Sequence, residues 1–311
     1  FLFMTGASMP FSFSKFKNAP NKWHIYRKII KRFVLLFIFG MIVQGNLLGL
    51  NPDSLYLYSN TLQSIAAGYL ITAVLFLYTS RRTQIGVAVA LLLVYWAAMQ
   101  FITIGSYGGG NYTPEGNLAE WIDRTVLGRF RDGAKVVDGE VVFAPWYHYT
   151  WILSTLNFGV TVLTGLFAGY IAKDKTSDIH KLKWYFGAGA AMVAAGWLWG
   201  LQMPVIKTIW TSSMVLVSSG YCFLLMGLFY YLIDYKGYKK NITWLKVYGM
   251  NSIVAYMLAN VINFSCLGQS LFYGMEQYLG NYYSFLISLS NVLVIYVILW
   301  LLYKRNIFLK V

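Results

Sequence analysis

Residues 283–303 read YSFLISLSNVLVIYVILWLLY, an apolar run without a single charged side chain. A helix of about 20 such residues spans the hydrocarbon core of a bilayer. Seven more uncharged stretches lie upstream, at 33–50, 57–79, 84–105, 151–172, 184–203, 211–233 and 247–267. They are continuously apolar and do not alternate with period two, which favours helices over a β-barrel. We therefore predict an all-α integral membrane protein, a polytopic helix bundle with eight full transmembrane helices.

The composition excludes a water-soluble globule. Of the 311 residues, 58% are hydrophobic and only 12% are charged, whereas soluble domains carry about twice that share of charge. The chain opens with another uncharged run, FLFMTGASMPFSFS at 1–14, which we expect to be the inner end of one truncated N-terminal helix. Cys222 and Cys266 fall inside predicted spans, so we expect packing residues rather than a disulfide. We expect 1–311 to form a single transmembrane domain.

The distribution of charge predicts the orientation of the chain. If 15–32 lies in the cytoplasm and the loops alternate, nearly all Lys and Arg residues fall on the cytoplasmic side. The exceptions are Arg124, Arg129, Arg131, Lys135 and Lys207. This asymmetry follows the positive-inside rule, so the net charge of +14 reflects topology. We expect the lipid bilayer as a partner, and no nucleic acid.

The longest connection, 106–150, is predicted to be an extracytoplasmic cap, because long loops in compact proteins usually carry a role. Within it, apolar side chains of 117–130 fall on one helical face, which predicts a short helix along the membrane surface. Asp138 and Gly139, between two β-branched runs, predict a two-residue hairpin. The loop ends in APWYHYTW at 144–151, whose rings suit either an interfacial belt or a platform on which a sugar stacks.

Amide and hydroxyl side chains recur in the outer half of the predicted spans. They are Gln44, Asn46, Asn60, Gln63, Gln100, Thr103, Ser154, Thr155, Asn157, Thr211, Ser212, Asn260 and Asn263. Such groups are costly against lipid, so we expect them to face the interior of the bundle. There they either link neighbouring helices or line a neutral cavity that opens to the outer face. A cavity of that kind suits a polyhydroxyl compound better than an ion.

Six strings of the sequence resemble a known family when taken in order. They are FLFMTGASMPFSFSK, NTLQSIAAGY, GNLAEWIDRTVLG, WILSTLNFGVTVLTGLFAGYIAKD, KTIWTSSMVLVSSG and VYGMNSIVAYML. The chain resembles the transmembrane acyltransferases typified by heparan-α-glucosaminide N-acetyltransferase, and looks closer still to their bacterial relatives of undefined function. The likeness runs over nearly the whole chain. Its sharpest matches are GMNSI at 249–253 and Ile-Asp-Arg at 122–124.

The resemblance implies a multi-pass enzyme of the bacterial cytoplasmic (inner) membrane, with the 106–150 loop outside. Such an enzyme takes an acetyl group from acetyl-CoA in the cytoplasm and passes it to a sugar or glycan amine or hydroxyl on the far side. The family's important His lies in an outer loop upstream of the motif at which this chain begins. The family also has an acidic turn where this chain has WYHYTW, so we expect a different sugar acceptor.

Acyl transfer needs a base for the acceptor proton and donors for the developing oxyanion. We therefore predict catalytic roles for His148, as a base, and for the neutral amides Asn157 and Asn46. For the acceptor we predict contacts from Gln63, Asp123, Arg124, Trp146 and Tyr147. For the acyl-CoA co-substrate we predict contacts from Lys15, Lys17, Arg32, Asn251 and Ser252. We expect no metal ion, and we leave a homo-oligomer open.

Two other functions are compatible with the pattern. A secondary transporter of a polar neutral solute also buries polar side chains at mid-depth. Against a carrier, the predicted spans contain no carboxylate or His that would couple transport to protons or sodium. A catalytically inactive membrane scaffold is the third interpretation.

Overall fold

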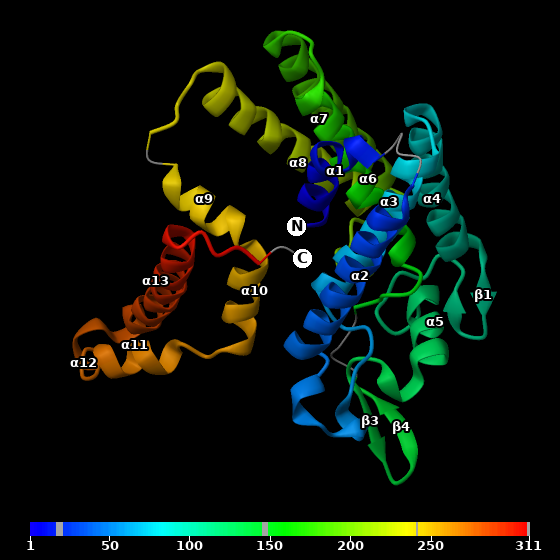
Figure 1. Ribbon diagram of the computed structural model, residues 1–311. Helices are drawn as coiled ribbons and strands as arrows, with labels where there is room; N and C mark the ends of the chain where they lie inside the picture. Colours follow the sequence, from blue (N-terminus) through cyan, green and yellow to red (C-terminus); the bar gives the residue numbers. More distant parts are fainter. Residues whose placement is uncertain (17–20, 145–148, 241, 310–311) are drawn as a thin grey trace. The chain divides into compact units, whose positions relative to one another are not determined.

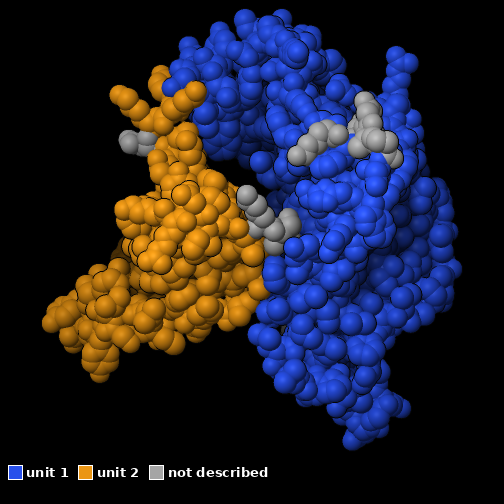
Figure 2. All heavy atoms as spheres, viewed as in Figure 1, with its two compact units in different colours: residues 1–237 blue, residues 238–311 orange. Residues whose placement is uncertain are grey.

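A computed structural model describes residues 1–16, 21–144, 149–240 and 242–309 of the chain. The protein is predominantly helical and divides into two compact units, 1–237 and 238–311 (Figure 2). The expectation that 1–311 forms a single transmembrane domain stays a prediction.

The first unit contains eight α-helices within its described residues (Figure 1). They are α1 (Leu2–Phe13), α2 (Trp23–Val43), α3 (Thr61–Tyr78), α4 (Arg81–Phe101), α5 (Leu118–Leu127), α6 (Thr155–Lys173), α7 (Asp178–Gly200) and α8 (Ser212–Phe229). Short 3-10 turns lie at Ser14–Phe16, Leu47–Gly49, Pro52–Ser54 and Gly128–Phe130, and a π-helical turn at Tyr230–Tyr235 extends α8.

Helix α6 lies at the centre of this unit and packs against α1, α3, α4, α7 and α8. Its closest neighbour is α1, and glycines allow the contact. A Cβ placed on Gly165 would lie 1.9 Å from the carbonyl oxygen of Phe3, and one on Gly6 would lie 1.8 Å from that of Val162. Small residues that let two backbones approach are the usual means of helix packing in membranes. Central helix α6 is therefore held rigidly.

Five helices are long and apolar enough to cross a membrane in the part of the chain that the structure describes, or six if one bent pair is a single span. Two predicted stretches, 33–50 and 184–203, overlap α2 and α7, which are not among them. Helix α2 carries four cations, from Arg27 to Arg32. The apolar sequence of α7 is interrupted by glycine and tryptophan residues, which lower its mean hydropathy. The structure thus agrees with a multi-pass membrane protein, while the count of eight spans stays a prediction.

The second unit consists of α9 (Thr243–Met250), α10 (Ser252–Val261), α11 (Ser265–Leu271), α12 (Glu276–Leu279), a 3-10 turn (Gly280–Tyr282) and α13 (Tyr283–Lys304). We expected one span over 247–267, but the structure breaks it twice. At Asn251 the backbone leaves helical geometry, and α10 and α11 are bent by 72°. Asparagine side chains bond to backbone at both breaks. Asn251 bonds to the distant Ile307 and Leu309, whereas Asn263 bonds to nearby backbone, which competes with helix continuation. Asn263 accepts the N–H of Ser265 at 3.0 Å.

The loop between α4 and α6 has the predicted parts. Helix α5 covers the amphipathic stretch, and β3 (Ala134–Val137) pairs with β4 (Glu140–Phe143) as an antiparallel hairpin. Asp138 and Gly139 have φ values of 51° and 84°, as a tight two-residue turn requires. A smaller hairpin, β1 (Thr103–Ile104) with β2 (Tyr107–Gly108), precedes α5. The short helix and the Asp138-Gly139 hairpin are thus confirmed.

Candidate functional site

A cluster of buried charges lies beneath α5. It consists of Glu120, Asp123, Arg131 and Asp132, each no more than 1% exposed. Sequence periodicity placed apolar residues of α5 on its buried face, yet the structure also buries its two carboxylates. Charges are almost never fully buried unless they are paired, so this charge cluster must be held by internal bonds.

Arg131 supplies most of these bonds. Its guanidinium donates to the carboxylate of Glu120 and to two carbonyls, those of Asp132 at 2.6 Å and Tyr149 at 3.3 Å. Asp132 in turn accepts the indole N–H of Trp151 at 3.0 Å. The charge cluster therefore fixes the segment 149–151, where the chain enters α6.

Asp123 fixes the same segment from the other side. Its carboxylate accepts the backbone N–H groups of Trp151 and Ile152 at 2.7 and 2.9 Å. Burial raises the pKa of this carboxyl to about 7, although the two backbone hydrogen bonds and Arg131 act in the opposite direction. Desolvation outweighs the favourable contacts because the carboxyl is removed from water. Asp123 therefore titrates near neutrality.

The fixed segment forms one wall of a cavity of about 330 Å³, which we call the aromatic cavity. Its lining residues are Gln44, Thr61, Ser64, Tyr149, Thr150, Trp151, Phe158, Lys207, Thr208 and Trp210. Four aromatic side chains, four Ser or Thr hydroxyls, one amide and one ammonium group thus surround a single space. Binding sites for small ligands usually combine apolar rings with a few oriented polar groups in this way.

A short loop before α8 also lines the aromatic cavity, and Trp210 is its most unusual residue. Trp210 has a φ of 52°, a left-handed conformation that is rare for a bulky side chain and is found most often at functional sites. Its indole N–H donates to the hydroxyl of Thr161 at 3.2 Å. Its ring packs edge-on against the Phe158 ring, with 5.0 Å between the two ring centres. Asn157 donates to the Trp210 carbonyl at 2.7 Å, which holds the strained backbone in place.

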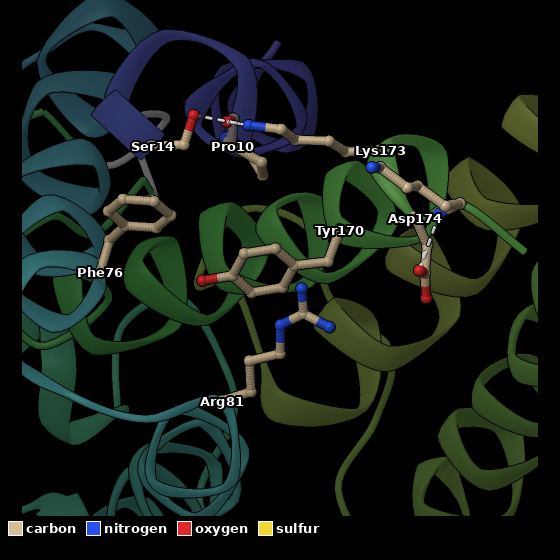
Figure 3. A pocket seen from close by; sticks show the side chains of 8 residues that line it. Pro10, Ser14, Phe76, Arg81, Tyr170, Lys173 and Asp174 are labelled. Carbon is tan, nitrogen blue, oxygen red and sulfur yellow. Dashed lines mark hydrogen bonds between the residues drawn. The ribbon is translucent and has the colours of Figure 1, made fainter. Parts of the chain in front are cut away.

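A second cavity, of about 320 Å³, lies at the other end of α6. We call it the basic cavity; its lining residues are Pro10, Ser14, Phe76, Arg81, Tyr170, Lys173, Asp174 and Lys175. Figure 3 shows the Arg81 guanidinium beside the Tyr170 ring, with Lys173 reaching toward Pro10 and Ser14. Phe158 and Tyr170 are twelve residues apart on α6, so the two cavities are separated by about 18 Å at 1.5 Å per residue.

The predicted oxyanion donors do not converge. Asn46 is exposed, and its amide N–H donates to Ser54 at 2.7 Å. Asn157 is fully buried beside the aromatic cavity, but its amide nitrogen already donates to Trp210 and Ser212. Its carbonyl oxygen has no hydrogen-bond partner within the described residues. Asn157 therefore presents a free acceptor rather than the donor that an oxyanion requires.

Of the predicted acceptor contacts, Gln63 and Asp123 are buried and bonded to backbone. Gln63 accepts the N–H groups of Ser59 and Asn60 at the start of α3. Arg124 is partly exposed, pairs with Glu120 at 2.7 Å and lies over the Phe143 ring. These residues support the walls of the site and do not line the aromatic cavity.

The other predicted acceptor and catalytic residues, Trp146, Tyr147 and His148, lie outside the described residues, as does Lys17. Lys15 belongs to the short turn after α1. Arg32 lies on α2 with its guanidinium 4.6 Å from the centre of the Tyr69 ring.

In the second unit, the side chain of Asn251 is bonded to the carbonyl of Ile307 and the N–H of Leu309. Ser252 begins α10. Both polar atoms of the Asn251 amide thus bond to the C-terminal segment of the same unit. These hydrogen bonds give Asn251 a structural role.

For the polar residues of the predicted spans, two roles were left open, linking helices or lining a cavity, and most of those with described bonds cap or cross-link helices. Asn60 and Gln63 form a capping box, and Thr211 caps α8. Ser154 bonds to Thr150 and to the carbonyl of Ile209, which ties together the two loops around the aromatic cavity. Among the thirteen, Gln44 alone is part of the described lining.

Sequence reasoning missed Arg131, Lys207 and Trp210 at one end of α6, and Arg81 and Lys173 at the other. Arg131 and Asp132 are adjacent residues of opposite charge in a chain with few charges. This pair could have indicated the buried charge cluster. No group of three His, Cys, Asp or Glu side chains that could hold a metal ion occurs among residues that the structure describes.

Neither a protein-family model nor a curated protein matches the chain. The resemblance to transmembrane acyltransferases therefore stays a prediction.

Proposed function

We propose that the protein is a transmembrane acyltransferase that moves an acetyl group from acetyl-CoA to an amine or hydroxyl of a sugar or glycan on the other side of the membrane. The observation that supports this best is the presence of two chemically different cavities at opposite ends of α6. One is rich in aromatic rings and hydroxyls, and the other is rich in cations.

The aromatic cavity suits the acceptor. The rings of Tyr149, Trp151 and Trp210 offer apolar faces, which complement the C–H faces of a pyranose, while Thr61 and Gln44 offer donors and acceptors for its hydroxyls. A binding site needs both kinds of contact to orient a small polar ligand. The volume of about 330 Å³ lies at the lower end of the range for small-molecule sites, as expected for one sugar ring.

The chemistry requires one bond exchange. The carbonyl carbon of the acetyl thioester forms a bond to the acceptor nitrogen or oxygen, its bond to sulfur breaks, and coenzyme A leaves as a thiol. The acceptor proton passes to a base, for which His148 stays the prediction. The amide nitrogen of Asn157 donates to the Trp210 carbonyl and so helps to position the loop that lines the acceptor site.

The separation of the cavities constrains the transfer. The pantetheine arm corresponds to about four residues of extended chain, or roughly 13–14 Å. Phe158 and Tyr170 are about 18 Å apart along α6. A thioester whose nucleotide stays in the basic cavity would therefore reach the level of Thr161, below the aromatic cavity. The acceptor has to enter past Trp210 for a direct transfer.

The experiment is to purify the full-length protein and measure both donor binding and transfer. We expect acetyl-CoA to bind with an affinity that falls as salt rises, because phosphates are attracted by cations. We also expect radiolabelled acetyl to appear on an amino sugar, and this to decline when Trp210 is replaced by Ala. Undetectable or salt-independent acetyl-CoA binding would contradict the proposal.

One observation favours a transporter as the second candidate. Helices α10 and α11 form a broken pair, and discontinuous helices form the solute sites of many carriers. Reconstitution in vesicles separates the two functions. Uptake of a labelled neutral sugar without acetyl-CoA would support transport, whereas labelled acetyl on the sugar would support the acyltransferase.

A further inference from the structure

The basic cavity has an excess of positive charge that the protein itself does not neutralise. Three of its lining side chains are cations, Arg81, Lys173 and Lys175, and one is an anion, Asp174. None of the three cations forms a salt bridge with the described carboxylates. Cations gathered around one space repel each other, so a bound anion would stabilise the arrangement.

Arg81 is positioned by a chain of contacts that ends at the buried Gln84. Its guanidinium lies 4.3 Å from the centre of the Tyr170 ring, and the Tyr170 hydroxyl donates to Gln84 at 3.1 Å. Gln84 is fully buried and donates in turn to the carbonyls of Leu75 and Thr79. A guanidinium carries its N–H groups at the edge of its plane, where they can bind a tetrahedral anion with two parallel bonds.

Lys173 is oriented as well. Its ammonium group donates to the carbonyl of Pro10 at 2.7 Å and to the hydroxyl of Ser14 at 2.5 Å. An ammonium group has three N–H donors, so one is left for a ligand. Figure 3 shows this side chain extended along one wall of the cavity, with Arg81 on the opposite side of Tyr170.

The helix dipole favours the position of Lys173 but not that of Arg81. A cation at the C-terminal end of a helix such as α6 is favoured by the helix dipole, whereas a cation in the first turn is disfavoured. Arg81 is the first residue of α4. Its charge therefore adds to the positive end of the α4 dipole, a combination that attracts anions.

We propose that the basic cavity is a phosphate-binding site, with Arg81 as its bidentate ligand and Lys173 and Lys175 as point charges. The ligand is a phosphate ester, either the nucleotide phosphates of a soluble donor such as coenzyme A or the headgroup of an anionic phospholipid. The first source rests on the proposed function, and the second does not.

The test uses the full-length protein in a neutral detergent, with inorganic pyrophosphate as the probe and calorimetry as the measurement. The test variant carries Arg81→Gln and Lys175→Gln. The matched control carries Arg82→Gln and Lys183→Gln, which remove the same charge from residues that do not line the cavity. All four side chains are exposed, so both variants should fold, as a thermal melt would verify.

We expect the control to bind pyrophosphate as the unaltered protein does, and the test variant to lose affinity by about tenfold or more, since charged hydrogen bonds are lost. Arg81→Lys should recover only part of the loss. Equal losses in the test and control variants, or no binding of pyrophosphate to any form, would overturn the site.

Two further arms identify the source of the phosphate. Coenzyme A that competes with pyrophosphate on the unaltered protein points to a soluble donor. Phosphatidylglycerol that competes in mixed micelles, where phosphatidylcholine does not, points to a lipid headgroup. A pyrophosphate site that no coenzyme A enters would keep this inference and count against the acyltransferase, so the two failures are distinguishable.

Discussion

The carboxylate of Asp123 accepts the backbone N–H of Trp151 at 2.7 Å, and this bond joins the loop helix α5 to the entrance of α6. Trp151 lines the aromatic cavity. One buried acid thus sets the position of a ring at the candidate acceptor site, from a residue 28 positions earlier in the chain.

Stability should depend on pH through Asp123. Burial raises its pKa from 3.8 to about 7, so between these values the folded protein holds a proton that the unfolded chain has released. Stability is therefore highest at low pH, falls as pH rises through this window, and levels off above it. The thermal midpoint of the purified protein, measured from pH 5 to 8, should decline toward pH 7.

The variant Asp123→Asn provides the control, because an amide does not titrate. Its midpoint should be lower overall, since one backbone N–H loses its acceptor, and should vary less with pH in this window. A variant with the same pH profile as the unaltered protein would assign the dependence to another group.

Arg131→Met should destabilise the protein strongly. The change removes the buried cation that pairs with Glu120 and Asp132 and leaves Glu120 only its pair with the partly exposed Arg124. Breaking a buried pair costs about 3–5 kcal/mol. Adding Glu120→Gln should restore part of the loss, because the uncompensated charge disappears. Chemical unfolding in detergent measures the free energy of unfolding of both variants. If Arg131→Met alone is as stable as the unaltered protein, the charge cluster is dispensable for stability.

Gly165→Ala should separate α1 from α6. Its Cβ would lie 1.9 Å from the Phe3 carbonyl oxygen, so the backbones must move apart. Gly86→Ala in α4 is the matched control, because no atom lies within 4 Å of its added Cβ. Alanine favours a helix by roughly 1 kcal/mol over glycine, so the control should be neutral or stabilised. Comparable melting of the two variants would contradict the close contact.

Sugar binding should change tryptophan fluorescence through Trp210. The amino sugar glucosamine is expected to perturb the emission of the unaltered protein, and Trp210→Phe should weaken its binding several-fold, since the indole bond to Thr161 is lost. Trp197→Phe on α7, where the ring is 54% exposed, controls for a lost fluorophore. An equal affinity in both variants would place the acceptor elsewhere.

The hairpin β3–β4 provides a test of sidedness. Glu140→Cys and Lys239→Cys place thiols at exposed positions on loops predicted to face opposite sides, in a background that carries Cys266→Ser. An impermeant maleimide should label the first variant in intact cells, and the second only after lysis. Labelling in the reverse order would invert the predicted topology.

Much of the local structure follows from the sequence. Continuous apolar runs place α3, α4, α6, α8 and α13, and the Asp138-Gly139 pair predicts the hairpin turn, because each signal is local. The broken span at Asn251 was not predicted, since the apolar pattern continues through it. The side chain at this break bonds to Ile307, far away in the sequence, and no local pattern reveals such a bond.

The candidate site was less predictable for the same reason. Amides such as Asn60 and Gln63 look alike in sequence whether they cap a helix or line a cavity, and only the backbone around them decides. Cations such as Arg81 and Lys173 satisfy the positive-inside rule wherever they point. The conformation of Trp210 depends on a bond from Asn157, which no pattern within the loop reveals.

Between Phe158 and Lys173, α6 contains no charged side chain. A phosphate-bearing donor would have no partner along this stretch, whereas an acetyl group is neutral and needs none. The protons of the proposed transfer are not neutral: the acceptor gives one to a base on the outer side, and the coenzyme A thiolate takes one from the cytoplasm, so each turnover moves one positive charge outward. The membrane voltage acts in proportion to charge, so collapsing an inside-negative voltage with an ionophore should raise the acetylation rate.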